Sequence, residues 1–422
     1  MQILIIGSGV RDYILAKYLS KLEGVDSVVA VPRSKMISEF ADCYDVEKTD
    51  VDSIVEFVSL NNIDLAVTFD EEVIATGIVE KFNDANLSIF APMKSSARIA
   101  LSKAIGKKFM YKTKIPTPRF AVIDKEVAGV EYLKNAQYPV VIKNDLFSSC
   151  EKPTICKSFS QAKRILELKF LVENNKVIIE DFIEGKEAAV YFLTDGYNAI
   201  PLVSTVPYKY SLEGKGGAIS CSNGVYAPAQ NIDFEKNEEI KQKIVYPALR
   251  EMSRNNNPYI GILGVQVIIT PDDKMYTIDF KIAPDDLDTN VIFSLLNTDF
   301  VKLANAAIVG ELADDYEEID LKKSCIVEAV LSSPNYWKTN IKNSIISGLE
   351  EVTDEVDIIF EEVCKNKYLE YETCGTRNMI VASGASTLGN ARKKLYENVD
   401  KIGYTDKKYL KDIAQTKNVD WV

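Results

Sequence analysis

The chain has 422 residues, of which 46% are hydrophobic and 27% are charged, a composition typical of a globular protein with two or three cores. Its formal net charge of −12 argues against nucleic-acid binding, because phosphate contacts need clustered Lys and Arg. Histidine is absent, so any acid–base or metal chemistry has to use carboxylate, lysine, cysteine, tyrosine or water.

The cysteines and the hydrophobic runs indicate the compartment. The seven cysteines are scattered without a CxxC pair, which is typical of reduced thiols and not of a zinc site. The chain begins with a strand pattern in place of an apolar leader, and no apolar run is long enough to span a bilayer. We therefore expect a cytoplasmic protein that binds neither membranes nor nucleic acid.

The first part of the chain, residues 1–101, is expected to form a Rossmann-like domain. The β-branched runs ILII, SVVAV, LAVTF and LSIF alternate with helical stretches at 11–22, 51–61 and 71–83. This alternation predicts a parallel sheet that is covered by helices on both faces.

A glycine turn follows the first predicted strand. A dinucleotide-binding GxGxxG motif would need glycine where Asp12 stands, and the second strand ends in proline, arginine and serine, so an NAD enzyme is not expected. Backbone N–H groups at a helix N-terminus favour an anion, and an arginine can add a planar fork to it. The candidates for such a substrate-phosphate site are Gly7, Gly9, Val10 and Arg11. A purely structural turn is the alternative.

Two lysines in the next part of the chain are candidates for contacts with nucleotide phosphates. The segment LSKAIGKKFMYKTKIPTPRF predicts a helix that opens near Ser102, with Lys103 in its first turn, and ends before Pro116. In YPVVIKND, Lys143 ends a short apolar strand. A lysine there can reach a phosphate as a point charge, although a solvated strand-end lysine is the common alternative.

The tract VIIEDFIEGKEAAV, residues 177–190, is typical of a hinge between two lobes that holds an adenine and a ribose. An apolar run ends in acidic residues, turns at Gly185 and leads into a second apolar run that carries Glu187. Backbone groups at the strand end can bind the base, and the Glu187 carboxylate can accept hydrogen bonds from two hydroxyls. The candidates at the strand end are Glu180, Asp181, Phe182 and Ile183. The alternative is a hairpin with an acidic turn.

The last parts of the chain add a carboxylate and a third unit. MYTIDF places Asp279 at the end of a strand, where a metal ligand could lie. The order of a strand-end lysine, an acidic hinge and a strand-borne carboxylate is similar to an ATP-grasp module. Residues 323–422 mix strands with a final helix, ASTLGNARKKLYENVDKI, whose apolar residues recur at helical spacing.

These tracts together resemble the glycinamide ribonucleotide synthetase family over nearly the whole chain. The matching tracts are ILIIGSGVRDYILA, the SK helix with its PTP turn, VVIK, VIIEDFIEGKEA, NGVYAPA, YIGILGVQVI with TIDF, SGLEEV and KIGYTDKKYLKDIA. The resemblance implies an α/β protein of three parts. These are the domain at 1–101, an ATP-grasp domain at 102–322 with a small lid at about 118–183, and an α+β domain at 323–422.

The resemblance also implies the chemistry. ATP would phosphorylate a glycine-like acid, and a phosphoribosylamine-like amine would displace the phosphate, as in purine biosynthesis. Lys209 and Asp286 match retained family positions and are the candidate catalytic residues. The family further implies Mg²⁺, with Asp279 as a ligand, in a monomer or a dimer.

This chain departs from the family pattern at the positions that matter for the chemistry. The family's Ile-Glu-Phe-Asn is Ile278-Asp279-Phe280-Lys281 here, and an ammonium offers no lone pair to a metal. The glycine-rich flap AAGKGV is replaced by residues 148–153, which contain no glycine. Three hypotheses therefore remain open: an active ligase, a degenerate protein that binds a nucleotide or a sugar phosphate without ligation, and a ligase for another acid and amine.

Overall fold

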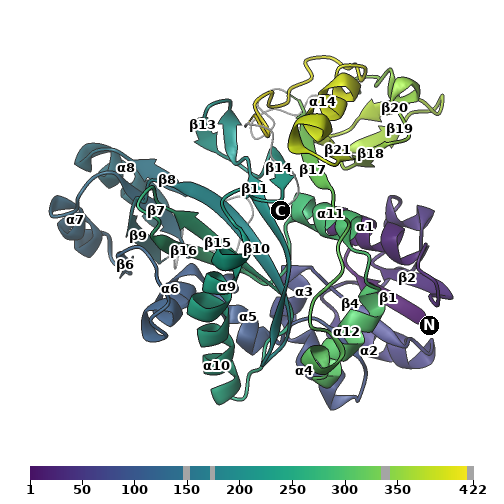
Figure 1. The fold of residues 1–422 in the computed structure, drawn as a ribbon, viewed down its shortest axis with the longest axis horizontal. Coiled ribbons are helices and arrows are strands. Elements are labelled where there is room, and N and C mark those ends of the chain that lie inside the picture. Colours follow the sequence, from purple (N-terminus) through teal and green to yellow (C-terminus); the bar gives the residue numbers. More distant parts are fainter. Residues whose placement is uncertain (146–152, 172–175, 334–342, 416–422) are drawn as a thin grey trace.

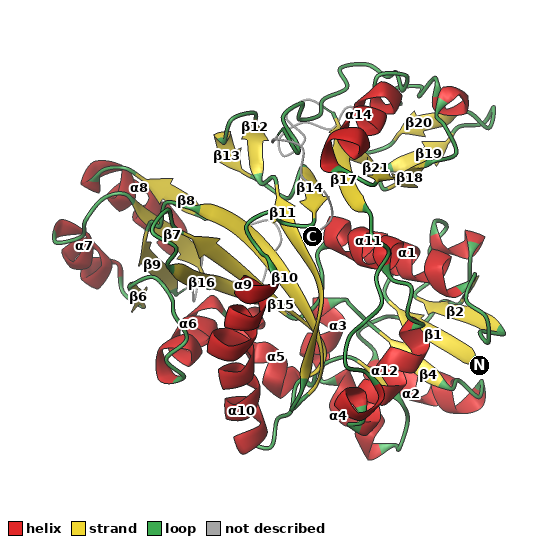
Figure 2. Cartoon of the chain, viewed as in Figure 1, coloured by secondary structure: helices red, strands yellow, loops and turns green. Residues whose placement is uncertain are grey.

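The computed structural model describes residues 1–145, 153–171, 176–333 and 343–415 of an α/β protein (Figure 1). Three main sheets and the helices that cover them make up the molecule (Figure 2). In the described ranges, no helix is both long enough and apolar enough to cross a membrane.

The N-terminal part contains a five-stranded parallel sheet in the order β3-β2-β1-β4-β5. Its strands are β1 (Gln2–Ile6), β2 (Ser27–Val31), β3 (Asp42–Cys43), β4 (Leu65–Val67) and β5 (Ile89–Phe90). The helices of this part are α1 (Val10–Leu19), α2 (Val51–Leu60), α3 (Glu71–Thr76) and α4 (Ile78–Asp84). Alternate β1 residues enter different cores, Ile3 and Ile5 one and Leu4 and Ile6 the other, because successive side chains of a strand point to opposite faces. The expected parallel sheet with both faces covered is confirmed.

A second, four-stranded sheet has the order β6-β9-β7-β8 and is antiparallel. Its strands are β6 (Phe120–Ile123), β7 (Val140–Asn144), β8 (Thr154–Cys156) and β9 (Val177–Asp181). Helices α7 (Glu126–Lys134) and α8 (Phe159–Phe170) pack on it around Leu133 and Leu166, and together they form a small separate core. This lobe, the lid, stands apart at one end of the molecule (Figure 1).

The third sheet has eight antiparallel strands in the order β16-β15-β10-β11-β14-β17-β21-β18. Its strands are β10 (Lys186–Asp195), β11 (Ala199–Pro207), β14 (Gly224–Ala227), β15 (Ile260–Ile269), β16 (Met275–Lys281), β17 (Cys325–Ser332), β18 (Val356–Phe360) and β21 (Arg377–Ala385). Because β14 pairs with β17, the C-terminal strands extend the sheet of the preceding part. The division of the chain at 322/323 stays a proposal.

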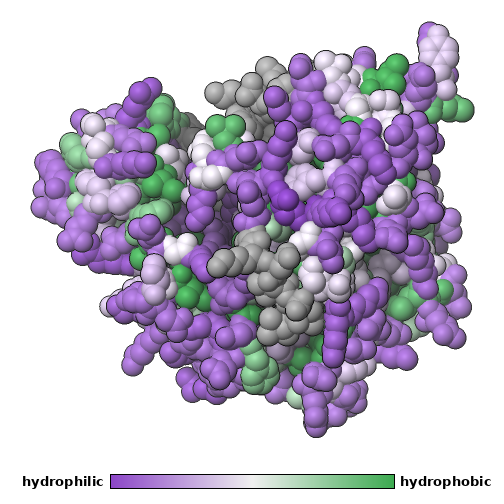
Figure 3. Space-filling view, turned by 45° about the horizontal axis from the view of Figure 1, so that its top comes forward, coloured by the Kyte–Doolittle hydropathy of each residue, from purple (hydrophilic) through white to green (hydrophobic). Residues whose placement is uncertain are grey.

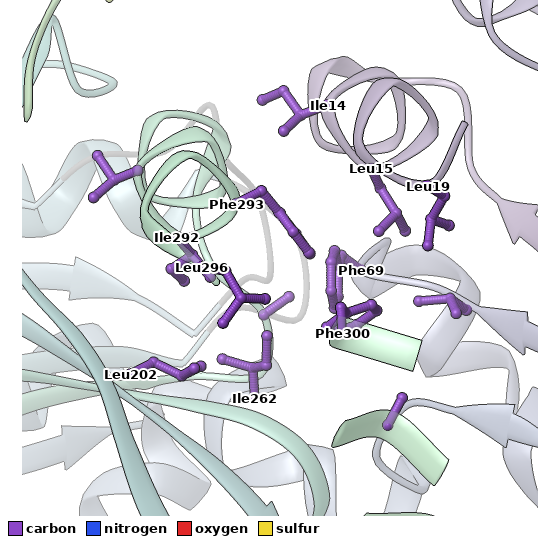
Figure 4. Packing of buried hydrophobic residues seen from close by; sticks show 14 of the residues in the cluster. Ile14, Leu15, Leu19, Phe69, Leu202, Ile262, Ile292, Phe293, Leu296 and Phe300 are labelled. Atoms are coloured by element: carbon purple, nitrogen blue, oxygen red, sulfur yellow. The ribbon is translucent and has the colours of Figure 1, made fainter. Parts of the chain in front are cut away.

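Helices cover both faces of the eight-stranded sheet. Ala188 and Val190 of β10 enter the core that contains residues of α5, α6, α9 and α10, while Ala189 and Tyr191 face α11 and α12. These helices are α5 (Lys94–Leu101), α6 (Lys103–Lys112), α9 (Phe234–Ile240), α10 (Tyr246–Arg254), α11 (Asp286–Leu295) and α12 (Phe300–Val309). Figure 4 shows Leu15 and Leu19 of α1 lying near Phe69, Phe293 and Phe300, so one apolar core joins the N-terminal part to α11 and α12.

The α-helices and strands not yet described are short, apart from the last helix. They are a helix turn, α13 (Leu312–Asp315), the small hairpins β12 (Tyr210–Leu212) with β13 (Gly216–Ile219) and β19 (Val363–Lys365) with β20 (Tyr371–Thr373), and the last helix, α14 (Leu388–Val399). Leu388 and Leu395 of α14 pack on β17 and β21, as the apolar spacing predicts. The face in Figure 3 is mostly hydrophilic, as the large charged fraction of the chain implies.

Candidate nucleotide and substrate site

The tract at 177–190 crosses from one sheet to another. Strand β9 belongs to the lid sheet and β10 to the eight-stranded sheet, so the two strands do not pair. The predicted crossing between two lobes is therefore confirmed and the alternative of a hairpin is wrong, while the binding of a base and a ribose at this crossing stays a prediction. Gly185 lies within this crossing, and a Cβ atom on it would come within 2.4 Å of the Ile269 carbonyl oxygen. A side chain at this position would push the crossing away from β15.

Backbone groups at the end of β9 are partly used by the lid. Asp181 N–H donates to the Arg119 carbonyl at 2.9 Å, and Phe182 N–H donates to the Pro139 carbonyl at 3.3 Å. Among the described residues, the Ile183 N–H has no acceptor. This N–H is therefore a donor at the crossing that could bind a base, whereas the lid uses the N–H groups of Asp181 and Phe182.

Helix α6 begins where the sequence predicts, and it presents Lys103 in its first turn. The Ser102 hydroxyl accepts a hydrogen bond from Ile105 N–H at 3.1 Å and donates to Asp145 Oδ1 at 2.8 Å. Asp145 Oδ1 also accepts from Ala104 N–H at 2.8 Å. Strand β7 is thereby tied to the N-terminus of α6, which brings Lys103 and Lys143 to the same region. The flap residues 148–152 lie outside the described residues.

A buried ion triad joins α6 to the lid sheet. Lys107 Nζ lies 2.8 Å from Glu180 Oε2, and Lys143 forms an ion pair with Glu180 Oε1. Lys107 and Glu180 are each only 3% exposed. Burial alone would raise the pKa of Glu180, but the ammonium groups of Lys143 and Lys107 lower it below its ordinary value. The Glu180 side chain is held by lysines and its backbone pairs with β6 and β7, so this residue positions the two lysines.

Lys107 belongs to the site, although the sequence interpretation did not assign it a role. It lies four residues after Lys103, on the same face of α6, and this spacing is the signal that was available. It also donates to Thr117 Oγ1 at 2.9 Å. Burial lowers its pKa below the ordinary value for lysine.

The predicted ribose carboxylate, Glu187, contacts two other polar side chains. Lys209 and the Gln266 amide both hydrogen-bond to Glu187 Oε1. The predicted catalytic Lys209 therefore lies next to the predicted nucleotide residues. Gln266 was missed, because nothing in its local pattern distinguishes it from any polar residue on a strand.

The carboxylate expected to bind a metal, Asp279, forms an ion pair with Lys103. Burial would raise the Asp279 pKa, but Lys103 and Lys143 lower it below its ordinary value. Lys281, two residues further along β16, pairs with Asp285, which precedes α11. Within the described ranges, no group of three Cys, Asp or Glu side chains has the arrangement of a metal site. The donor set around Asp279 does not fit Mg²⁺, which prefers several oxygen ligands in octahedral geometry.

The glycine turn lies between β1 and α1, as predicted, but the chain supplies a carboxylate to it. Gly9 N–H donates to Asp12 Oδ2 at 2.9 Å, and a Cβ atom on Gly7 would lie 2.3 Å from the same oxygen. Asp12 is 4% exposed, and burial raises its pKa to about 7. The substitution that removes the dinucleotide motif is thus a cap of α1. The Asp12 carboxylate thus accepts from the Gly9 N–H, one of the backbone groups that were predicted to bind a phosphate.

Arginines from two parts of the chain meet at the predicted catalytic Asp286. Arg11 Nη2 lies 2.6 Å from Glu71, and its Nε lies 3.6 Å from Asp286 Oδ1. Arg377 Nη1 lies 3.1 Å from Asp286 Oδ2. Asp286 is therefore held between a residue of α1 and a residue of β21. Sequence reasoning gave no role to Arg377, which is 91 residues away from Asp286.

The structure thus brings the predicted residues into two adjoining groups. The first group surrounds the sheet crossing and contains Lys103, Lys143, Glu180, Glu187, Lys209 and Asp279. The second group lies at the glycine turn and contains Gly7, Gly9, Val10, Arg11 and Asp286. Asp285 joins the two, because Lys281, Lys209 and Arg11 together hold its pKa well below the ordinary range against the opposing effect of burial.

Comparison with known proteins gives a consistent result. The family model described as the N domain of phosphoribosylglycinamide synthetase matches residues 1–100, and the model for its ATP-grasp (A) domain matches residues 101–289. A phosphoribosylamine–glycine ligase from Clostridium acetobutylicum is 31% identical over 99% of this chain and 100% of its own length.

Solved structures show the same fold. A phosphoribosylamine–glycine ligase from Thermotoga maritima superposes with a TM-score of 0.81 at 23% identity, over 98% of this chain and 100% of that chain. A biotin carboxylase from Campylobacter jejuni, solved as a β,γ-ATP complex, has a TM-score of 0.74 at 13% identity, over 97% of this chain and 92% of that chain.

Proposed function

The chain belongs to the phosphoribosylglycinamide synthetase family of ATP-grasp ligases, and from this premise we propose that it joins a glycine-like acid to a phosphoribosylamine-like amine in an ATP-driven reaction. The observation that carries the proposal is the sheet crossing at 182–185, which is bordered by a set of lysines and by Glu187. Such a site between two lobes suits a nucleotide with its base at the hinge and its phosphates at the lysines.

The proposed reaction has two steps. A carboxylate oxygen of the acid attacks the γ-phosphorus of ATP, and the bond to the β-phosphate oxygen breaks to give an acyl phosphate and ADP. The amine nitrogen then attacks the acyl carbon, phosphate leaves with its electron pair, and the nitrogen loses a proton. The protein contributes by positioning the reactants and by stabilising negative charge with fixed cations.

The residues have distinct proposed roles. Lys103 and Lys143 bind phosphates, the Ile183 N–H, which the described residues of the lid leave free, binds the base, and Glu187 binds the ribose. The acidic side chain of Glu180 holds Lys107 and Lys143 in place. No step is assigned to Mg²⁺, because Asp279 is paired with Lys103 and Lys281 offers no lone pair.

The amine substrate is proposed to bind at the second group. The N–H groups of Gly9 and Val10, together with Arg11, would hold its phosphate once the phosphate displaces the Asp12 carboxylate from the Gly9 N–H, and Gly7 lets the turn approach closely. Lys209 would stabilise the charge of the acyl phosphate. Asp286, held between two arginines, would accept a hydrogen bond from the amine.

The domain division at 101/102 and 322/323, a cytoplasmic location and a monomeric or dimeric state complete the proposal.

One assay distinguishes the ligase proposal from the two other hypotheses, a degenerate nucleotide-binding protein and a ligase for another acid and amine. The purified full-length protein is incubated with ATP, glycine and phosphoribosylamine, and ADP and the amide product are measured by mass spectrometry. We expect both products in equal amounts. ATP binding without ADP formation would favour the degenerate protein, and ADP formation only with another acid would favour a retargeted ligase.

Replacing Glu187 with alanine is expected to weaken ATP binding by about 1–3 kcal/mol, the range for charge-assisted hydrogen bonds. The carboxylate is the proposed acceptor for the ribose hydroxyls, and its loss also releases Lys209 and Gln266. The affinity is measured by isothermal titration calorimetry. Glu131→Ala is the control, because it removes the same charge from an exposed position on α7, outside the crossing. Equal affinities of the two variants would contradict the ribose role.

A further inference from the structure

Strand β16 presents a carboxylate and an ammonium, those of Asp279 and Lys281, on its face toward the candidate site. Asp279 and Lys281 are two residues apart, so their side chains leave the same face of the strand, while Phe280 between them is buried in the core. Asp279 is paired with Lys103, and Lys281 is paired with Asp285. The face of the strand where a cation would lie next to a carboxylate is therefore occupied by two ammonium groups.

The neighbouring carboxylates are engaged as well. Both oxygens of Asp288 accept hydrogen bonds, one from the Tyr191 hydroxyl and one from the Thr205 hydroxyl, each at 2.7 Å. Within the described ranges, no group of three carboxylates is arranged around Asp279 to hold a divalent ion, and two ammoniums would repel such an ion.

The surroundings of Lys281 are built for its side chain. It pairs in register with Gly264 of β15, and a Cβ atom on Gly264 would lie 2.9 Å from the Lys281 Cβ and 2.7 Å from the Tyr191 ring. A larger residue would displace both side chains. Lys281 is 17% exposed, whereas its partner Asp285 is 41% exposed. Packing thus fixes the base of the Lys281 side chain, while its more exposed counterion Asp285 can be exchanged for another anion.

We infer that this site binds a nucleoside triphosphate without a divalent cation, and that the ammonium groups of Lys281 and Lys103 neutralise the phosphates in its place. The inference rests on the proposed function, since it concerns the same nucleotide. On binding, a phosphate oxygen replaces the Asp285 carboxylate, which is 41% exposed, as the partner of Lys281. Lys103, which is 32% exposed, keeps Asp279 as its partner and turns its open side to the phosphates. Phosphate and carboxylate oxygens are both acceptors for an ammonium, so Lys281 stays paired while Asp285 is released to water.

The test compares ATP affinity of the full-length protein in excess EDTA and in excess MgCl₂ by isothermal titration calorimetry. We expect the wild type to bind in EDTA at least as tightly as with Mg²⁺. In the double variant Lys281→Asn with Asp285→Gly, which removes the ammonium and its counterion together, affinity in EDTA should fall at least tenfold, and Mg²⁺ should restore part of it.

The control is Lys274→Asn with Asp272→Gly, because these residues form an exposed ion pair in the turn that precedes β16. Its affinity in EDTA should match the wild type. Lys281→Gln is a second variant, in which the side chain keeps nearly the same length but loses its charge. Circular dichroism checks that each variant is folded. A wild type that binds ATP only with Mg²⁺ overturns this inference and leaves the ligase proposal intact. A wild type that binds no ATP under either condition overturns both.

Discussion

Replacing Glu180 with glutamine is expected to lower the free energy of unfolding by about 3–5 kcal/mol, the range for removing one partner of a buried ion pair. Glu180 is the common counterion of Lys107 and Lys143, and all three side chains are buried. The neutral amide leaves two ammonium groups close together, away from water. The loss is measured by urea denaturation followed by circular dichroism at pH 7.

Two further variants distinguish the stability lost by breaking the ion triad from the stability lost by any substitution of a glutamate. Glu131→Gln removes an exposed carboxylate from an ion pair on α7, and its effect should stay below about 1 kcal/mol. Adding Lys107→Met to Glu180→Gln removes one of the two unpaired ammoniums and should recover part of the loss. If Glu180→Gln unfolds at the same urea concentration as Glu131→Gln, the carboxylate does not hold the two lysines.

Local patterns predicted the elements of this site better than its contacts. Ser102 caps α6, Lys143 is the last but one residue of its strand and the glycine turn joins β1 to α1, because each feature depends on residues within a few positions of one another. The partner of Glu187 on β15 is 79 residues away, and only the pairing of β10 with β15 brings the two together. Such a contact has no signal in a single sequence.

Lys281 and Asp12 show two different limits of sequence reasoning. Both were recognised only as departures from expected motifs, Lys281 from a metal-binding strand and Asp12 from a glycine fingerprint. The structure gives each a partner, Asp285 for Lys281 and the Gly9 N–H for Asp12. The Asp12 partner lies three residues away and follows the spacing of a helix cap, so it was open to prediction. The Lys281 partner depends on how the chain leaves β16 and enters α11.

Replacing Asp12 with asparagine is expected to stabilise the protein above pH 7 and to have little effect at pH 4. The pKa of Asp12 rises from 3.8 to about 7 in the folded protein because the side chain is buried. The folded state therefore binds a proton more tightly than the unfolded state, so wild-type stability falls as the pH rises from about 4 to about 7. Over this window the Asp12 contribution amounts to at most roughly 4 kcal/mol, at 1.36 kcal/mol per pKa unit.

The measurement is the difference in unfolding free energy between Asp12→Asn and the wild type at several pH values. Taking this difference removes the effect of other buried acids, such as Glu361, whose pKa burial also raises to about 7. Asparagine keeps an oxygen that can accept from Gly9 N–H, so the cap remains while the charge is lost. Asp52→Asn, an exposed acid in the first turn of α2, should show no such pH dependence. A difference for Asp12→Asn that stays constant from pH 4 to pH 8 would mean that the pKa of Asp12 is not raised, so that its carboxylate is fully ionised at pH 7 and opposes an anion at the glycine turn.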